Sequence, residues 1–127
     1  MTLLLDTHFL VWLVLGSRRL AGYPWIDRYR PWGVSPVSFL EIQFLAEVGR
    51  VAVRNPEFMD AVMTDERFTV DDPPIVTLVR HALRLSWTRD PFDRLLAAHS
   101  AARRVPLCSV DRDMRRYHRL LPAELSR

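Results

Sequence analysis

Hydrophobic residues in this chain form short continuous runs and longer periodic segments. Leu3–Leu5 is a continuous apolar run that ends in Asp6, which predicts a short buried strand. Phe9–Leu15 is longer and stops at Gly16, which predicts a buried helix. Further strands are predicted at Trp32–Val34, Phe68–Val70 and Leu107–Val110, the last ending in Asp111.

Prolines and small polar residues mark the starts of further helices. Ser35 before Pro36 predicts an N-cap followed by the first helical position, where the missing proline N–H costs nothing. This helix should stop at Gly49 and bury one face, made of Val37, Leu40, Phe44, Leu45 and Val48. Other helices are predicted over about Leu20–Arg30, from Pro56 to about Met63, after Asp111, and from Pro74 with the apolar set Ile75, Leu78, Val79, Ala82 and Leu83.

Strands that alternate with helices predict an α/β fold with a parallel sheet covered on both faces. The length of 127 residues predicts a single domain over residues 1–127. The four glycines are not clustered, which excludes a P-loop and a dinucleotide-binding fingerprint.

The composition restricts the cellular compartment in which the protein is expected to work. The single cysteine, Cys108, excludes an internal disulfide and a multi-cysteine zinc site. No apolar run approaches the roughly 20 residues of a membrane span, and the opening MTLLLD lacks the basic start of a secretory signal. We therefore expect a cytoplasmic protein with no membrane partner.

The basic residues are all arginines, and they cluster near the end of the chain. The net charge is +3, and arginine binds phosphate with two parallel hydrogen bonds. The cluster favours a polyanionic partner, although a solvated helix face would look the same. Its members are Arg112, Arg115, Arg116 and Arg119, which surround Tyr117 and His118.

Several acidic residues lie where a predicted strand is followed by a helix, or where a helix begins. Asp6, Asp93 and Asp111 lie at such strand–helix junctions or at a helix start, and Glu41 lies early in the helix after the second strand. Sites in open parallel sheets form at the carboxyl ends of strands, so these acids can meet at one edge. Each also has a structural interpretation as a helix cap, and Ser38 with Glu41 matches the capping-box pattern S-x-x-E.

Four neighbouring carboxylates would repel one another unless a cation neutralises them. Mg²⁺ and Mn²⁺ prefer such oxygen ligands. An acidic centre beside a basic surface therefore points to a metal-dependent nuclease acting on a phosphodiester backbone. Cys108 and His99 lie in apolar segments and are expected to be structural, and His8 is expected to pack or to organise its turn.

The two aspartates in the stretch RDPFDRLL are predicted to have different roles. Asp90 before Pro91 predicts an N-cap and a first helical residue. Asp93 then falls at the third helical position, where the helix dipole favours a negative charge. We expect Asp93 to face the other acids and Asp90 to cap the helix, with an indirect role at the site left open.

These motifs together resemble PIN-domain ribonucleases, especially the VapC-type toxins of type II toxin–antitoxin systems. LLLDTHFLVW is similar to the opening motif of that family, SPVSFLEI to the second, RDPFDRLLAAHS to the third and LCSVDRD to the last. Ser109 stands where a threonine or serine often precedes the final aspartate. The likeness extends from Leu3 to about Tyr117 and is weakest between Arg54 and Trp87.

The resemblance implies an α/β/α sandwich with a short central parallel sheet. It implies a Mg²⁺-dependent endoribonuclease, with Mn²⁺ as an alternative, that hydrolyses RNA with metal-activated water. By position, Asp6 and Asp93 would be the chief metal ligands, and Glu41 and Asp111 would complete the site. It also implies a cognate antitoxin and a homodimer. Two alternatives remain, an RNA-processing nuclease that is not a toxin and a non-catalytic binding module of the same fold.

Overall fold

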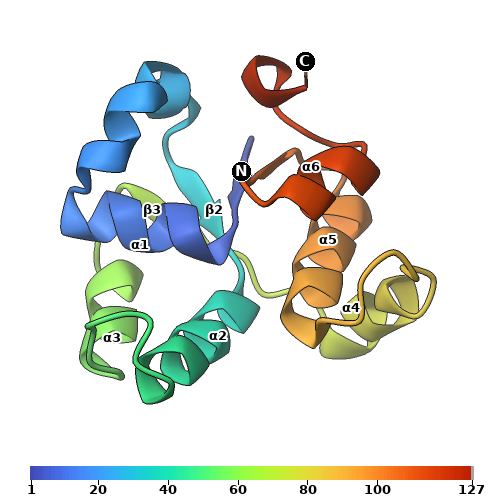
Figure 1. The fold of residues 1–127 in the computed structure, drawn as a ribbon, viewed down its shortest axis with the longest axis horizontal. Helices are drawn as coiled ribbons and strands as arrows, with labels where there is room; N and C mark the ends of the chain where they lie inside the picture. The colour runs from blue at the N-terminus through green and yellow to red at the C-terminus, as the bar shows by residue number, and fades with distance from the viewer. Residues whose placement is uncertain (127) are drawn as a thin grey trace.

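The computed structural model describes residues 1–126 and places a parallel sheet between two groups of helices (Figure 1). Within these residues the sheet has four strands in the order β3-β2-β1-β4, with every pairing parallel. The strands are β1 (Leu4–Leu5), β2 (Trp32–Val34), β3 (Phe68–Val70) and β4 (Leu107–Cys108). The helices are α1 (Thr7–Leu15), α2 (Pro36–Glu47), α3 (Glu57–Met63), α4 (Ile75–Ala82), α5 (Pro91–Arg103) and α6 (Arg112–Tyr117), with 3-10 helices η1 (Arg18–Gly22), η2 (Pro24–Tyr29) and η3 (Ala123–Leu125).

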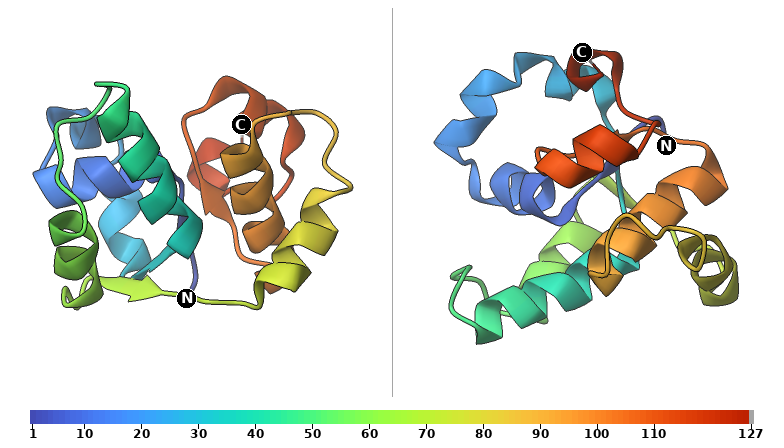
Figure 2. Two further views of the ribbon diagram at one scale, coloured as in Figure 1. Left: turned by 90° about the horizontal axis from the view of Figure 1, so that it is seen from below. Right: turned by 45° about the vertical axis from the view of Figure 1, so that its right-hand side comes forward.

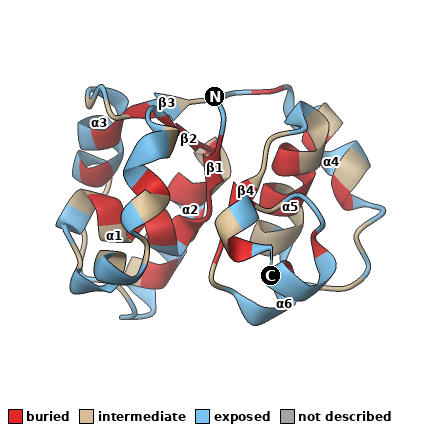
Figure 3. Cartoon of the chain, turned by 90° about the horizontal axis from the view of Figure 1, so that it is seen from above, coloured by how far each residue is buried: buried red, intermediate tan, exposed pale blue. Residues whose placement is uncertain are grey.

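The two halves of the chain cover opposite faces of the sheet. Helices α1, α2 and α3 lie on one side, and α4, α5 and α6 lie on the other (Figures 2 and 3). Successive side chains of a strand point to opposite faces: Leu3 and Leu5 enter the core under the first group, and Leu4 packs with Ala97 and Met114 under the second. Burial on both faces explains the continuous apolar run and confirms the expected α/β/α sandwich.

Gly33 allows β1 and β2 to approach closely. Its N–H donates to the carbonyl of Leu3 at 2.7 Å, and Leu4 is its partner in the ladder. A Cβ at residue 33 would lie 2.7 Å from the Leu3 carbonyl oxygen, which is closer than packed atoms allow. Glycine at this position therefore brings together the carboxyl ends of the two strands, where Asp6 and Ser35 follow.

The predicted helix over Leu20–Arg30 is wrong in type, because this segment forms η1 and η2 instead. The two 3-10 helices meet at Tyr23, which has φ −134° and ψ 56° and so interrupts the helical path. Pro24 follows and has no N–H to continue an α-helical ladder. The segment still contributes to the core through Ile26, whose carbonyl accepts a hydrogen bond from the Trp32 indole at 2.8 Å.

The predicted buried face of α2 is wrong at Leu40, Phe44 and Val48, although Leu45 is buried as expected. Leu40 and Phe44 are 65% and 48% exposed, whereas Phe39, Ile42 and Leu45 are buried. Apolar residues occupy two neighbouring stripes of this helix, and periodicity alone does not show which stripe meets the sheet. Only the packing of α2 against the sheet and α5 selects the stripe that also carries Glu41.

In helix α4, too, the predicted apolar set differs from the set of residues that is buried. It begins after Pro74, as predicted, but only Leu78 and Ala82 of its apolar set are buried. The exposed members are Ile75 at 62%, Val79 at 42% and Leu83 at 74%. Helix α4 packs on α5, so one narrow side of it is covered and an apolar face remains at the surface.

Candidate active site

Asp6 follows β1 directly and caps α1. Its Oδ1 accepts a hydrogen bond from the N–H of Phe9 at 3.0 Å, and its own N–H donates to the carbonyl of Cys108 in β4 at 3.0 Å. The residue is only 5% exposed. Burial raises the pKa of its carboxyl, although hydrogen bonds from Phe9 and Ser109 partly oppose the rise. Asp6 is therefore both a helix cap and a buried acid at the sheet edge.

Glu41 lies in the second turn of α2 with its side chain buried. The N-cap of this helix is Ser35, which accepts a hydrogen bond from the N–H of Val37 at 3.3 Å, so the capping-box interpretation of Ser38 and Glu41 is wrong. The hydroxyl of Thr7 donates to Oε1 of Glu41. Burial raises the pKa of Glu41, and the Thr7 hydrogen bond partly offsets the rise.

The two aspartates at the start of α5 occupy the positions predicted for them. Asp90 is the N-cap, and its Oδ1 accepts hydrogen bonds from the N–H groups of Phe92 at 2.8 Å and Asp93 at 3.3 Å. Asp93 lies in the first turn, partly buried. Phe92 packs against Phe44 of α2 with ring centroids 5.9 Å apart, which links the helices that carry Asp93 and Glu41.

Asp111 stands after β4, where the chain turns into α6. The strand is shorter than predicted, because it ends at Cys108 and the hydroxyl of Ser109 then accepts the N–H of Asp111 at 3.0 Å. The carboxylate of Asp111 caps α6 by accepting the N–H of Met114 at 2.8 Å. Unlike Asp6, Asp111 is exposed to solvent.

The four predicted acids lie close enough for their negative charges to act on one another, and the pKa values of three of them, Asp6, Glu41 and Asp93, are raised. Burial and the negative charges of Asp90, Asp111, Glu41 and Asp6 raise the pKa of Asp93 to about 7. Asp111 also raises the pKa of Asp6, and Asp6 raises that of Glu41. The structure thus brings Asp6, Glu41, Asp93 and Asp111 to one edge of the sheet, which we call the acidic edge, and adds the charge of Asp90.

The acidic edge fits a hard divalent cation by its chemistry. Its donors are carboxylate oxygens and hydroxyls, the ligand type that Mg²⁺ and Mn²⁺ prefer. Burial is the main cause of its raised pKa values, and repulsion between the carboxylates adds to it; a cation would remove that repulsion. Across residues 1–126, no three His, Cys, Asp or Glu side chains are drawn together tightly enough to form a coordination group. Direct binding of one ion by more than two of these carboxylates would therefore require their side chains to move.

The sequence analysis missed the contribution of Thr7 to this edge. No role was predicted for Thr7, yet its hydroxyl donates a hydrogen bond to Glu41, 34 residues further along the chain, and lies 3.1 Å from that of Ser38. No local pattern links residues so far apart, and only the meeting of α1 and α2 brings them into contact. The one available clue was the spacing of Thr7 directly after Asp6.

Cys108 and His99, which were predicted to be structural, are both buried. Burial raises the pKa of the Cys108 thiol far above its ordinary value, which makes it unreactive. His99 is fully buried, and its Nε2 lies 2.7 Å from Oδ2 of Asp71, which also accepts from Arg103 at 2.9 Å. Its Nδ1 has no partner among the described residues, so the expectation of a satisfied histidine holds for one nitrogen only. His8 is exposed beside the acidic edge.

The comparisons with known proteins agree with this architecture. The family model of the PIN domain matches residues 3–120. A chain of the VapBC2 complex of Rickettsia felis, solved bound to a DNA fragment from its promoter, has a TM-score of 0.64 and 16% identity over 95% of this chain and 96% of that one. A chain of a toxin–antitoxin complex from Klebsiella pneumoniae has a TM-score of 0.60 and 16% identity over 87% and 88%.

A search of curated protein sequences found no match. Within the described part of the chain, no helix has the length and apolar character needed to cross a bilayer. The family match covers all four positions of the acidic edge, because residues 3–120 include both Asp6 and Asp111. The chain belongs to the PIN domain family.

Proposed function

We propose that this chain is the toxin of a type II toxin–antitoxin pair and acts as a metal-dependent endoribonuclease. The observation that carries the proposal is the acidic edge, where mutual repulsion and burial raise the pKa of Asp93 to about 7. Membership of the PIN domain family supports a nuclease. The likeness in fold to chains from two toxin–antitoxin complexes supports the biological role.

Asp6 and Asp93 would be the chief ligands of Mg²⁺, with Mn²⁺ as an alternative. Glu41 and Asp111 would complete the set, either directly or through water, because all four carboxylates influence one another's charge. When bound, the cation supplies positive charge that stabilises a transferring phosphoryl group and lowers the pKa of a water molecule.

Neighbouring residues of the chain fix the positions of the carboxylate oxygens. The Phe9 N–H fixes one oxygen of Asp6, and Thr7 fixes Oε1 of Glu41. Oε2 of Glu41 would then accept a hydrogen bond from the attacking water and take up its proton. A bond forms between the water oxygen and phosphorus as the bond from phosphorus to the ribose oxygen opposite it breaks, and that ribose oxygen takes up a proton from solvent water, so one RNA strand becomes two.

Replacement of Asp6 or Asp93 by asparagine tests this assignment. Each change keeps the shape of the side chain and removes the charge, so we expect cleavage of single-stranded RNA in Mg²⁺ to fall by roughly 10³-fold. EDTA should abolish cleavage by the wild type. Asp113→Asn is the matched control, because Asp113 is an exposed acid of α6 outside the edge, and it should cut at nearly the wild-type rate.

An unchanged cleavage rate in Asp6→Asn or Asp93→Asn would exclude the proposed chemistry. The biological role needs a separate measurement. Growth and RNA 5′ ends are compared in cells that express the chain with and without the neighbouring gene, which would encode the antitoxin. We expect growth arrest and new RNA ends only without that gene. Normal growth and no new ends would exclude a toxin.

The apolar face of α4 supports a homodimer. Ile75 and Val76 are each 62% exposed, and Leu83 is 74% exposed, on a helix of eight residues. Exposed apolar patches of this kind mark protein interaction sites. Val76→Glu should convert a dimer into a monomer in sedimentation velocity, whereas Arg80→Glu on the same helix should not. A wild type that sediments as a monomer would exclude this assembly.

A further inference from the structure

Helix α6 and the residues after it carry a strip of positive charge that the proposed chemistry does not use. Arg112, Arg115 and Arg116 lie one helical turn apart on α6, Arg119 lies just after the helix, and all four are exposed. Within residues 1–126, none of them lies within ion-pair distance of a carboxylate, unlike Arg28, Arg30, Arg67 and Arg103. We call these four unpaired arginines the basic strip.

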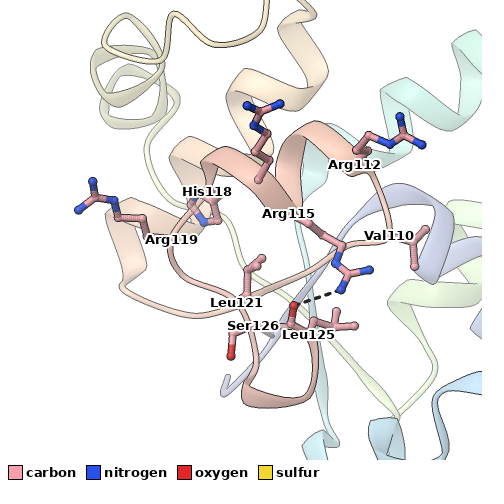
Figure 4. Close-up of a pocket in the computed structure, with 9 residues that line it drawn as sticks. Val110, Arg112, Arg115, His118, Arg119, Leu121, Leu125 and Ser126 are labelled. Carbon is pink, nitrogen blue, oxygen red and sulfur yellow. Dashed lines mark hydrogen bonds between the residues drawn. The ribbon is translucent and has the colours of Figure 1, made fainter.

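The basic strip borders an open hollow rather than a closed pocket. The hollow has a volume of about 620 Å³, and its floor includes Leu125 and Ser126. Figure 4 shows Arg115 reaching inward, where Nη2 donates to the carbonyl of Leu125 at 3.3 Å, while Arg112 and Arg119 extend away in opposite directions. Charges spread in this way fit an extended polyanion better than a small anion, which would need donors converging on one point.

The strip begins at the acidic edge. Asp111 is the N-cap of α6, and Arg112 is the next residue. Clustered carboxylates by themselves repel a nucleic acid, so a neighbouring region of positive potential is needed to attract and hold it. The basic strip is the region of that kind that adjoins Asp111 directly in the chain.

An aromatic pair beside the strip favours single-stranded RNA over an acidic protein segment. Tyr117 is 46% exposed and stacks on Trp87 with ring centroids 5.8 Å apart. The guanidinium of Arg116 lies 5.2 Å from the centre of the Tyr117 ring. Aromatic rings and guanidinium planes accept the unstacked bases of single strands, which a carboxylate-rich peptide does not have.

We propose that the basic strip binds the phosphodiester backbone of single-stranded RNA and leads it to the acidic edge. This inference rests on the proposed ribonuclease function. The arginines of the strip act as positioning residues, because they contact phosphates away from the bond that is cut. Removing them should therefore raise KM for RNA and leave kcat nearly unchanged.

RNA binding measured in EDTA tests the basic strip independently of the cleavage reaction. The probe is a fluorescent oligouridylate, and fluorescence anisotropy is measured over a range of salt concentrations. Arg112→Gln, Arg116→Gln and Arg119→Gln are combined, and Arg115 is kept because it also bonds Leu125. The matched control combines Arg18→Gln, Arg54→Gln and Arg84→Gln, three exposed arginines on η1, between α2 and α3, and after α4.

We expect the strip variant to lose at least about tenfold in affinity and its salt slope to fall by about 2, since each phosphate contact contributes roughly 0.7. The control should bind within about twofold of the wild type, since its arginines lie off the strip. Equal loss in both variants, or no loss in the strip variant, would overturn the inference. Tighter strip-dependent binding of polyglutamate than of RNA would also overturn it, in favour of an acidic protein segment.

Cleavage assays with Mg²⁺ distinguish the two proposals. If the wild type does not cut RNA but still binds it through the strip, only the ribonuclease function is wrong. If the wild type cuts RNA and the strip variant cuts it with unchanged kcat/KM, only the strip is wrong. A raised KM at constant kcat supports both.

Discussion

The acidic edge and the basic strip differ in how firmly their charged groups are held, and not only in sign. Asp6 and Glu41 are at least nine-tenths buried, and each accepts a hydrogen bond from a fixed donor. The arginines of the strip are exposed, and within residues 1–126 Arg115 alone among them has a side-chain hydrogen bond. Groups that take part in chemistry need fixed geometry, whereas long-range attraction needs only net charge.

This difference means that a conservative replacement should have unequal effects in the two regions. Asp6→Glu keeps the charge but adds a methylene at a site with no space, so we expect kcat to fall by about 10²-fold. Arg116→Lys keeps the charge at a flexible site, and kcat/KM should change by about twofold or less. Both are measured on the same RNA in Mg²⁺. Equal losses in the two variants would show that the strip is as strictly positioned as the edge.

Removing one charge from the acidic edge should stabilise the protein when no cation is present. The pKa of Asp93 rises from 3.8 to about 7 on folding, so its carboxyl binds a proton more tightly in the folded state. Its contribution to stability is complete below pH 3.8 and is lost as the pH rises through 7. The shift sets an upper limit of about 4 kcal/mol, which solvent screening reduces to roughly 1–2 kcal/mol.

Urea unfolding in EDTA measures this effect. Asp93→Asn should raise the free energy of unfolding at pH 8, and its advantage over the wild type should shrink as the pH falls towards 4. Addition of Mg²⁺ should stabilise the wild type but not the variant, because ligand binding stabilises only the state that binds. An Asp93→Asn variant less stable than the wild type at pH 8 in EDTA would contradict the inference that the other carboxylates of the acidic edge repel Asp93.

Thr7 offers a smaller change that acts on the same edge through Glu41. Thr7→Val keeps the size of the side chain and removes the donor, so the Glu41 carboxylate should lose its orientation and kcat should fall by roughly tenfold. Thr7→Ser restores a hydroxyl and should recover most of the activity. If valine and serine behave alike, the Thr7 contact is structural and does not position Glu41.

Local sequence determined the starts of the helices and the acids placed there. Ser35 with Pro36, and Asp90 with Pro91, act as N-cap and first helical residue as predicted. These assignments depend on hydrogen bonds within three residues, such as that from the N–H of Phe92 to Asp90. Short-range chemistry of this kind leaves few alternatives, so the positions of Asp6 and Asp111 after strand ends, and of Asp93 in the first turn of α5, could be predicted.

Only the tertiary structure decided which helix faces are covered and how the acids are oriented. The sequence predicted that Leu40 and Phe44 belong to a buried face of α2, but both side chains are exposed, and Glu41 is buried beside Ser38 and Thr7. Likewise, Tyr23 and Pro24 break a segment that the periodicity predicted as one helix. Periodicity reports how apolar side chains recur along a helix. The covered stripe is selected by the shape of the sheet and the neighbouring helices, which residues far apart in the chain create together.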